Sequence, residues 1–82
     1  MAKIEFDRHA KRRMKERNVS EEEAMASIEN PDFLAASLKG RKNAFKFING
    51  RYLRITYNLD ATGNITVITA VARKKPFESA TI

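Results

Sequence analysis

The chain has 82 residues, a formal net charge of +6, 43% hydrophobic residues, one histidine and no cysteine. A chain of this length forms one small domain that buries about 60–65% of the surface its unfolded form exposes, which excludes separate catalytic and cofactor domains. Without cysteine there are no disulfides, thiolate metal ligands or cysteine nucleophiles, and we expect neither a metal nor a cofactor.

A short extended segment and a helix are predicted at the start of the chain. Lys3–Phe6 is expected to be extended, and Asp7 can cap the following helix by accepting a hydrogen bond from an exposed backbone N–H. The helix runs to about Arg17 because no glycine or proline interrupts it. Asn18 then suits the left-handed conformation that commonly ends a helix.

A second helix is predicted from Ser20 to the dipeptide Asn30-Pro31. Ser20 and Glu23 have the spacing of a capping box, in which each side chain accepts from the backbone N–H of the other residue. The apolar stripe of this helix consists of Ala24, Met25 and Ile28. The helix ends at Asn30 because the residue before a proline avoids helical geometry.

After Pro31 the pattern alternates with period 2, which predicts strands over Phe33–Leu38, Ala44–Ile48, Arg51–Asn58 and Ile65–Ala72. Turns are expected at Gly40, at Asn49-Gly50 and within residues 60–64. The order β-α-α-β-β-β-β predicts an α+β fold in which two N-terminal helices pack on one face of an antiparallel sheet. We expect a single domain over residues 1–73 and a C-terminal tail over residues 74–82.

The two-residue turn at Asn49-Gly50 fixes the register of the hairpin. It pairs Ile48 with Arg51, Lys46 with Leu53 and Ala44 with Ile55, so these residues share one face. The other face has Phe45, Phe47, Tyr52, Arg54, Thr56 and Asn58. Neither face is uniformly apolar, so which one meets the helices stays open. Aromatics beside Arg54 fit base stacking on a sheet, and they equally fit an ordinary half-exposed sheet.

The charge is concentrated in two basic blocks around an acidic one. Residues 1–17 have a net charge of +4, residues 18–38 of −5, and residues 39–59 of +6 without any acidic residue. Basic blocks are typical of nucleic-acid contacts or of an acidic protein partner, and also of a solvated surface. No apolar run approaches the roughly 18 residues of a membrane span and no signal segment is evident, so we expect a cytoplasmic protein without a membrane partner.

Within the first basic block, His9, Arg13 and Arg17 form a column at helical spacing along the edge of the apolar stripe of Phe6, Ala10 and Met14. One interpretation is that Arg13 and Arg17 lay their stems on the core and pair with a carboxylate such as Glu23 or Glu29. The other is that the column lines a groove and contacts phosphate.

The motif His9-Ala10-x-x-Arg13-Met14-x-x-Arg17, followed by Ser20-Glu21-Glu22-Glu23, resembles a family of small prokaryotic domains of unassigned function. Asn30-Pro31, Gly40-Arg41 and Val67-Ile68-Thr69-Ala70 match the same family, and the resemblance covers residues 6–72. That family is similar in layout to the RelE/ParE/BrnT superfamily of type II toxins. The resemblance implies a RelE-like fold, an acidic antitoxin partner, and either RNA cleavage on the ribosome or inhibition through protein contacts. The catalytic residues of RelE-like toxins do not map onto this sequence.

The leading functional hypothesis is a metal-independent endoribonuclease of RelE/BrnT type that cuts messenger RNA. Its catalytic residues would be His9 as acid and base, with Arg13, Arg17, Lys46 and Arg54 stabilising phosphorane charge. Nucleic-acid contacts would come from Lys39, Arg41, Lys42, Arg51, Arg73, Lys74 and Lys75. The alternative is a non-catalytic module that binds nucleic acid or protein, or a small homodimer.

Overall fold

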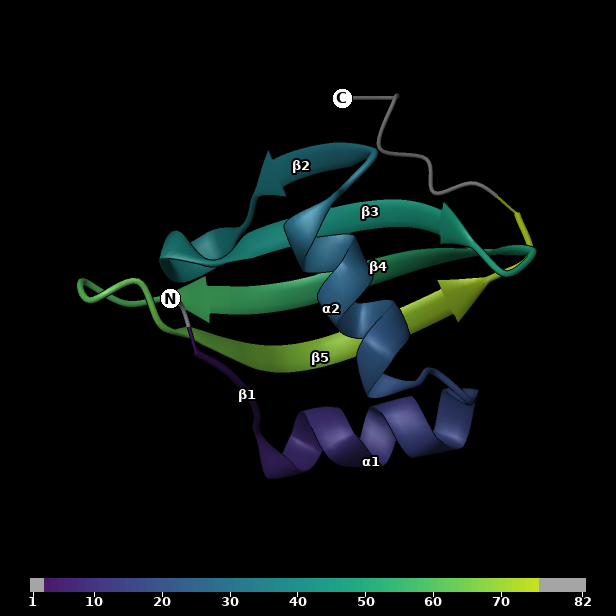
Figure 1. Cartoon of the computed structure of the whole chain (residues 1–82), viewed down its shortest axis with the longest axis horizontal. Helices are drawn as coiled ribbons and strands as arrows, with labels where there is room; N and C mark the ends of the chain where they lie inside the picture. Colours follow the sequence, from purple (N-terminus) through teal and green to yellow (C-terminus); the bar gives the residue numbers. More distant parts are fainter. Residues whose placement is uncertain (1–2, 76–82) are drawn as a thin grey trace.

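The computed structural model describes residues 3–75 as two helices and a five-stranded sheet in the predicted α+β order. The elements are β1 (Ile4–Phe6), α1 (Arg8–Arg17), α2 (Glu21–Glu29), β2 (Phe33–Ala36), the 3-10 turn η1 (Leu38–Gly40), β3 (Lys42–Ile48), β4 (Arg51–Leu59) and β5 (Ile65–Arg73). Figure 1 shows α2 lying across the sheet and α1 running alongside β5. In the predicted tail, residues 74–75 form a bend, and residues 76–82 lie outside the described part of the chain.

The strands lie in the order β1-β5-β4-β3-β2, and the three hairpin pairings are antiparallel. The expectation of an antiparallel sheet is wrong at one edge, because β1 runs parallel to β5 with Ile4 opposite Ile65 and Phe6 opposite Val67. The physical reason is the connection: β1 and β5 are joined through both helices and the whole meander, and a connection of that length permits parallel pairing. A three-residue strand has no local signal for direction.

The β3–β4 hairpin has the register that its two-residue turn predicts, with Ala44 opposite Ile55 and Ile48 opposite Arg51. Asn49 and Gly50 both have positive φ, 54° and 79°, as a tight hairpin turn of this kind requires. The face of the hairpin that meets the helices is the one with Ala44 and Ile55, because both residues are fully buried.

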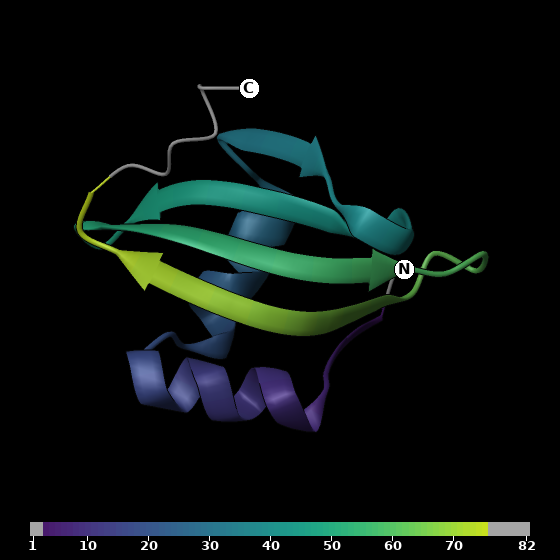
Figure 2. The same ribbon diagram turned by 180° about the vertical axis from the view of Figure 1, so that it is seen from behind.

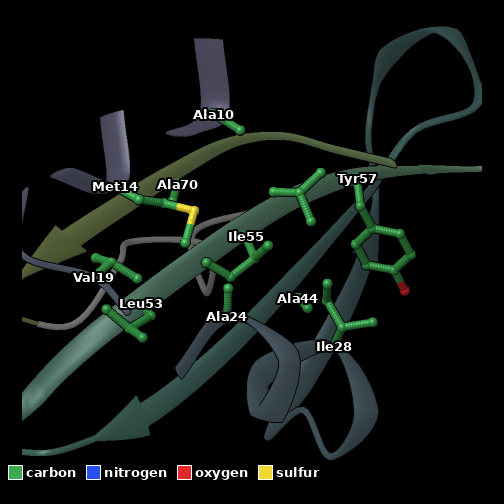
Figure 3. Packing of buried hydrophobic residues seen from close by; sticks show 11 residues of the cluster. Ala10, Met14, Val19, Ala24, Ile28, Ala44, Leu53, Ile55, Tyr57 and Ala70 are labelled. Atoms are coloured by element: carbon green, nitrogen blue, oxygen red, sulfur yellow. The ribbon is translucent and has the colours of Figure 1, made fainter. Parts of the chain in front are cut away.

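One hydrophobic cluster joins both helices to this face of the sheet (Figure 3). It contains Met14 from α1, Ile28 from α2, and Leu53 and Ile55 from β4. Four alanines are fully buried in it, on α1, α2, β3 and β5: Ala10, Ala24, Ala44 and Ala70. Small side chains at these positions let the helix and sheet backbones approach closely, so larger residues there would overpack the core.

The predicted helix ends are present. The Asp7 carboxylate accepts a hydrogen bond from the Ala10 N–H at 3.0 Å, and Asn18 ends α1 in the left-handed region with φ 55°. Ser20 and Glu23 form the capping box, with N···O distances of 2.9 and 3.0 Å. These local contacts fix where each helix starts before any tertiary packing is considered.

Arg51, at the start of β4, ties the hairpin to both helices. Its guanidinium donates to the Arg17 carbonyl at 2.7 Å, to the Asn18 carbonyl at 2.8 Å and to the Glu23 carboxylate at 3.2 Å. Asn49 also donates to this carboxylate, at 2.7 Å. The interpretation that Arg13 and Arg17 pair with a carboxylate such as Glu23 or Glu29 has the wrong partners: Arg13 pairs with Glu16, Arg17 donates to the Ala70 carbonyl, and the partner of Glu23 is Arg51.

Replacing Arg51 by Met is expected to lower the free energy of unfolding by about 2 kcal/mol, because it removes the cationic partner of a buried carboxylate and the donor to the last carbonyls of α1. Urea denaturation measures this change. Lys15→Met, at an exposed position on α1, serves as the control and should change stability by less than about 0.5 kcal/mol. Equal effects of the two substitutions would contradict a stabilising role for the Arg51 contacts.

Stability should also fall in acid through Glu23. Burial alone raises the pKa of Glu23, but the hydrogen bonds from Asn49 and Ser20 and the charge of Arg51 outweigh it and hold the pKa below its ordinary value. A carboxyl with a depressed pKa stabilises the fold above its unfolded-state pKa, about 4.3, and this contribution is lost as the pH falls through the folded-state pKa. Urea midpoints between neutral and acidic pH should therefore fall less steeply for Glu23→Gln than for the parent chain.

Candidate nucleic-acid interface

The column on α1 is only partly buried. Arg13 and Arg17 are half-buried, whereas His9, in the first turn of the helix, is exposed. The Arg13 Nε lies 3.5 Å from the His9 Nε2, and the Arg13 guanidinium is 3.3 Å from the Glu16 carboxylate. Arg17 turns inward and donates to the Ala70 carbonyl on β5 at 3.3 Å. His9 and Arg13 are therefore neighbours, and Arg17 is engaged with the sheet.

Lys46 has a structural contact of its own. It lies on the helix-facing side of β3, and its ammonium donates to the Asn30 carbonyl at the end of α2 at 2.9 Å, with the Asp32 carboxylate 3.8 Å away. No basic residue occupies the last turn of α2, so Lys46 supplies the cation that favours a helix C-terminus. That missing cation was the sequence signal from which this contact could have been inferred.

Arg54 lies on the opposite side of the sheet from this group. It alternates with the core residues Leu53 and Ile55, and its neighbours across the sheet are Phe45 on β3 and Val71 on β5. The five predicted catalytic residues therefore do not gather at one point. His9 and Arg13 lie together on α1, while Lys46 and Arg54 are on opposite faces of the sheet.

The face of the sheet with Arg54 is not covered by either helix, as Figure 2 shows from behind. Aromatic side chains gather on it in two pairs. The rings of Phe33 and Phe45 have centroids 5.7 Å apart, and those of Phe47 and Tyr52 are 4.6 Å apart. Phe33 is 50% exposed and Phe47 51% exposed. We call this surface the open face; it runs over β2, β3, β4 and β5.

Two cations share the open face with the aromatic pairs. Arg73 stands opposite Tyr52, and Arg54 stands opposite Phe45. Burial and the neighbouring charge of Arg73 lower the pKa of Arg54, and a guanidinium nevertheless remains charged at neutral pH.

The other predicted nucleic-acid contacts are distributed over the ends of the strands. Lys39 lies in η1, Arg41 directly precedes β3, and Lys42 is the first residue of β3. Lys74 and Lys75 follow β5 directly after Arg73, and both are exposed. Arg51 is engaged with the helices, as described above. By strand alternation, Arg41 and Arg73 belong to the open face, whereas Lys42, opposite Tyr57, belongs to the helix-facing side.

A shallow hollow of about 550 Å³ lies at the start of α1, lined by Asp7, Arg8, His9 and Arg12. The Tyr57 side chain lies in the hydrophobic core, away from this hollow, and burial raises the pKa of its phenol. Within residues 3–75, no three side chains of the metal-ligating types gather in one place. Neither of the two described helices is long and apolar enough to cross a membrane.

Comparison with known proteins gives one match. Residues 6–72 match the model of a family described as a domain of unknown function, DUF4258. No curated protein and no solved structure matches the chain. The family match covers the region from the end of β1 to the end of β5, which contains both helices and the hairpins of the sheet. Since it spans well over half of the chain, the protein belongs to the DUF4258 family.

Proposed function

We propose that this domain binds single-stranded RNA on the open face of its sheet. The observation that carries the proposal is the pair of half-exposed rings, Phe33 and Phe47, beside the cations Arg54 and Arg73 on one surface. Sheet surfaces that combine aromatic rings with cations bind single strands because bases stack on the rings and phosphates meet the charges.

Stacking supplies affinity without a sequence code. Each base that stacks on an aromatic side chain contributes about 1–3 kcal/mol to the free energy of binding, so two stacked bases would supply much of the affinity. The two platforms here are the pairs Phe33–Phe45 and Phe47–Tyr52. Arg41, which directly precedes β3, and Lys74 and Lys75, which follow β5, would hold the backbone of the strand as it enters and leaves the face.

A second candidate is the endoribonuclease toxin of RelE/BrnT type with an acidic antitoxin, and the nearness of His9 to Arg13 favours it. In that reaction the ribose 2′-hydroxyl attacks the adjacent phosphate and the 5′-oxygen leaves. His9 would carry the proton, and Arg13 with the nearby Arg12 would stabilise the charge of the phosphorane. Lys46 is not part of this group, because it holds the end of α2.

Phe47→Ala is expected to weaken binding of a labelled single-stranded RNA by about 5- to 100-fold, the loss of one stacked base. Fluorescence anisotropy measures the dissociation constant. Leu59→Ala is the matched control. Leu59 is a similarly exposed apolar residue, but it follows the core residues Ile55 and Tyr57 of β4 at every second position and so belongs to the helix-facing side of the sheet. Equal binding by Phe47→Ala and the parent chain would contradict a stacking role for the open face.

The salt dependence of the same measurement separates RNA from a protein ligand. Binding through about five phosphates should weaken steeply with salt, with a slope near −0.7 per phosphate in a plot of log K against log salt concentration. Arg73→Gln should make this slope shallower. A flat response would instead favour the alternative of a protein-binding module.

Expression of the parent chain should slow bacterial growth and fragment messenger RNA if the second candidate is correct, and His9→Ala should abolish both effects. Removal of a group that transfers a proton costs about 10²- to 10⁴-fold in rate. Lys11→Ala, an exposed substitution in the same helix, is the control and should leave both effects intact. RNA cleavage by His9→Ala at the parental rate would exclude the histidine from the chemistry.

A further inference from the structure

We propose that the domain forms a symmetric dimer in which β2 pairs antiparallel with β2 of a second copy, joining the two sheets edge to edge. The strand order makes β1 and β2 the edges of the described sheet, and only β3 lies beside β2. This interface does not require RNA, because its hydrogen bonds come from the backbone edge of the sheet.

The two edges of the sheet differ in how they are protected. Natural proteins guard exposed strand edges with charged residues, prolines or bulges. The β1 edge is short and has an ion pair between Lys3 and Glu5 at 3.1 Å. The β2 strand reads Phe-Leu-Ala-Ala, without a charge or proline, and Phe33 and Leu34 are 50% and 46% exposed. An apolar, uncharged edge of this kind is suited to pairing with another strand.

The backbone groups that would pair can be identified from the register. Ser37 N–H donates to the Arg41 carbonyl at 2.7 Å, and alternate residues of an antiparallel strand bond to the same neighbour. Ala35 therefore faces β3, opposite Asn43, while the N–H and C=O of Leu34 and Ala36 point away from β3. A second β2 centred on Ala35 would place Leu34 of each copy opposite Ala36 of the other.

The charges that flank β2 select a second copy in antiparallel orientation. Acidic residues precede the strand, at Glu29 and Asp32, and basic residues follow it, at Lys39, Arg41 and Lys42. Antiparallel pairing brings the acidic end of each copy to the basic end of the other, whereas parallel pairing would bring like charges together. The edge is thus complementary to itself, as a two-fold interface requires.

Four residues per strand make a small interface. We therefore expect a weak dimer with a dissociation constant between roughly micromolar and millimolar, below the size class of permanent dimers. The central positions are alanines, Ala35 and Ala36, so the two edges can approach without displacing large side chains. Dimerisation would make one continuous ten-stranded sheet with the two open faces side by side.

Sedimentation equilibrium of the full chain at low salt, without RNA, tests the proposal. The parent chain should form dimers as its concentration rises. Ala36→Pro should weaken the dimer about tenfold or more, since it removes an outward N–H from each copy without touching the β2–β3 ladder. Ala36→Thr keeps the N–H and should dimerise like the parent. A chain that stays monomeric up to about 1 mM, or a dimer that Ala36→Pro leaves unchanged, would overturn the proposal.

A charge exchange between the flanks gives a second test that does not depend on proline. Glu29→Lys and Lys39→Glu each place like charges at both ends of their own homodimer, so each variant alone should dimerise more weakly than the parent. Their mixture should restore association, because in the mixed dimer each end again has opposite charges. Both substituted residues are exposed, so folding should be unaffected. Failure of the mixture to associate better than either variant alone would refute the antiparallel orientation.

Discussion

The contacts of the Glu23 carboxylate are the point on which the arrangement of helices and hairpin depends. The same two oxygens close the capping box at the start of α2, accept from the Asn49 amide and pair with the Arg51 guanidinium. Arg51 extends the connection to the end of α1. One carboxylate thus joins the start of α2 and the neighbouring end of α1 to the tight turn of β3–β4, where Asn49 lies 26 residues after Glu23. A carboxylate that is nearly buried tolerates this position only because each oxygen has donors.

The basic residues on the two sides of the sheet have different surroundings. On the helix side, Lys46 and Arg51 donate to backbone carbonyls at helix ends and Arg17 donates to the Ala70 carbonyl within β5, so these cations stabilise the fold. On the open face, Arg54 and Arg73 stand among aromatic rings. A net charge of +6 therefore overstates the charge that the helix side offers a polyanion, because these three cations already have partners within the fold.

The parts of this structure that the sequence predicts are those governed by local chemistry. The capping residues Asp7 and Ser20 and the Asn49-Gly50 turn act within a few residues, and the hairpin register follows from that turn alone. The direction of β1 was not predictable in this way, because it depends on a partner strand about sixty residues later. The role of Arg51 was equally hidden, because a cation in a strand gives no sign of which helix end it will reach. For Lys46 the sequence offered one signal, the absence of a basic residue from the last turn of α2. Helical spacing placed Arg17 correctly at the edge of the core, whereas His9 is exposed in the first turn of α1.

The open face and the edge of β2 share one residue, Phe33. Phe33 belongs to both, since its ring contributes to the aromatic surface while its backbone lies in the edge strand. In an isolated monomer the half-exposed Phe33 ring and the apolar strand β2 are both in contact with water, which is unfavourable in free energy. Pairing of two β2 strands would cover part of that apolar surface and would align the aromatic surfaces of two copies into one. The RNA strand proposed for a single open face could then continue onto the second, which would raise the affinity through linked binding without any new kind of contact.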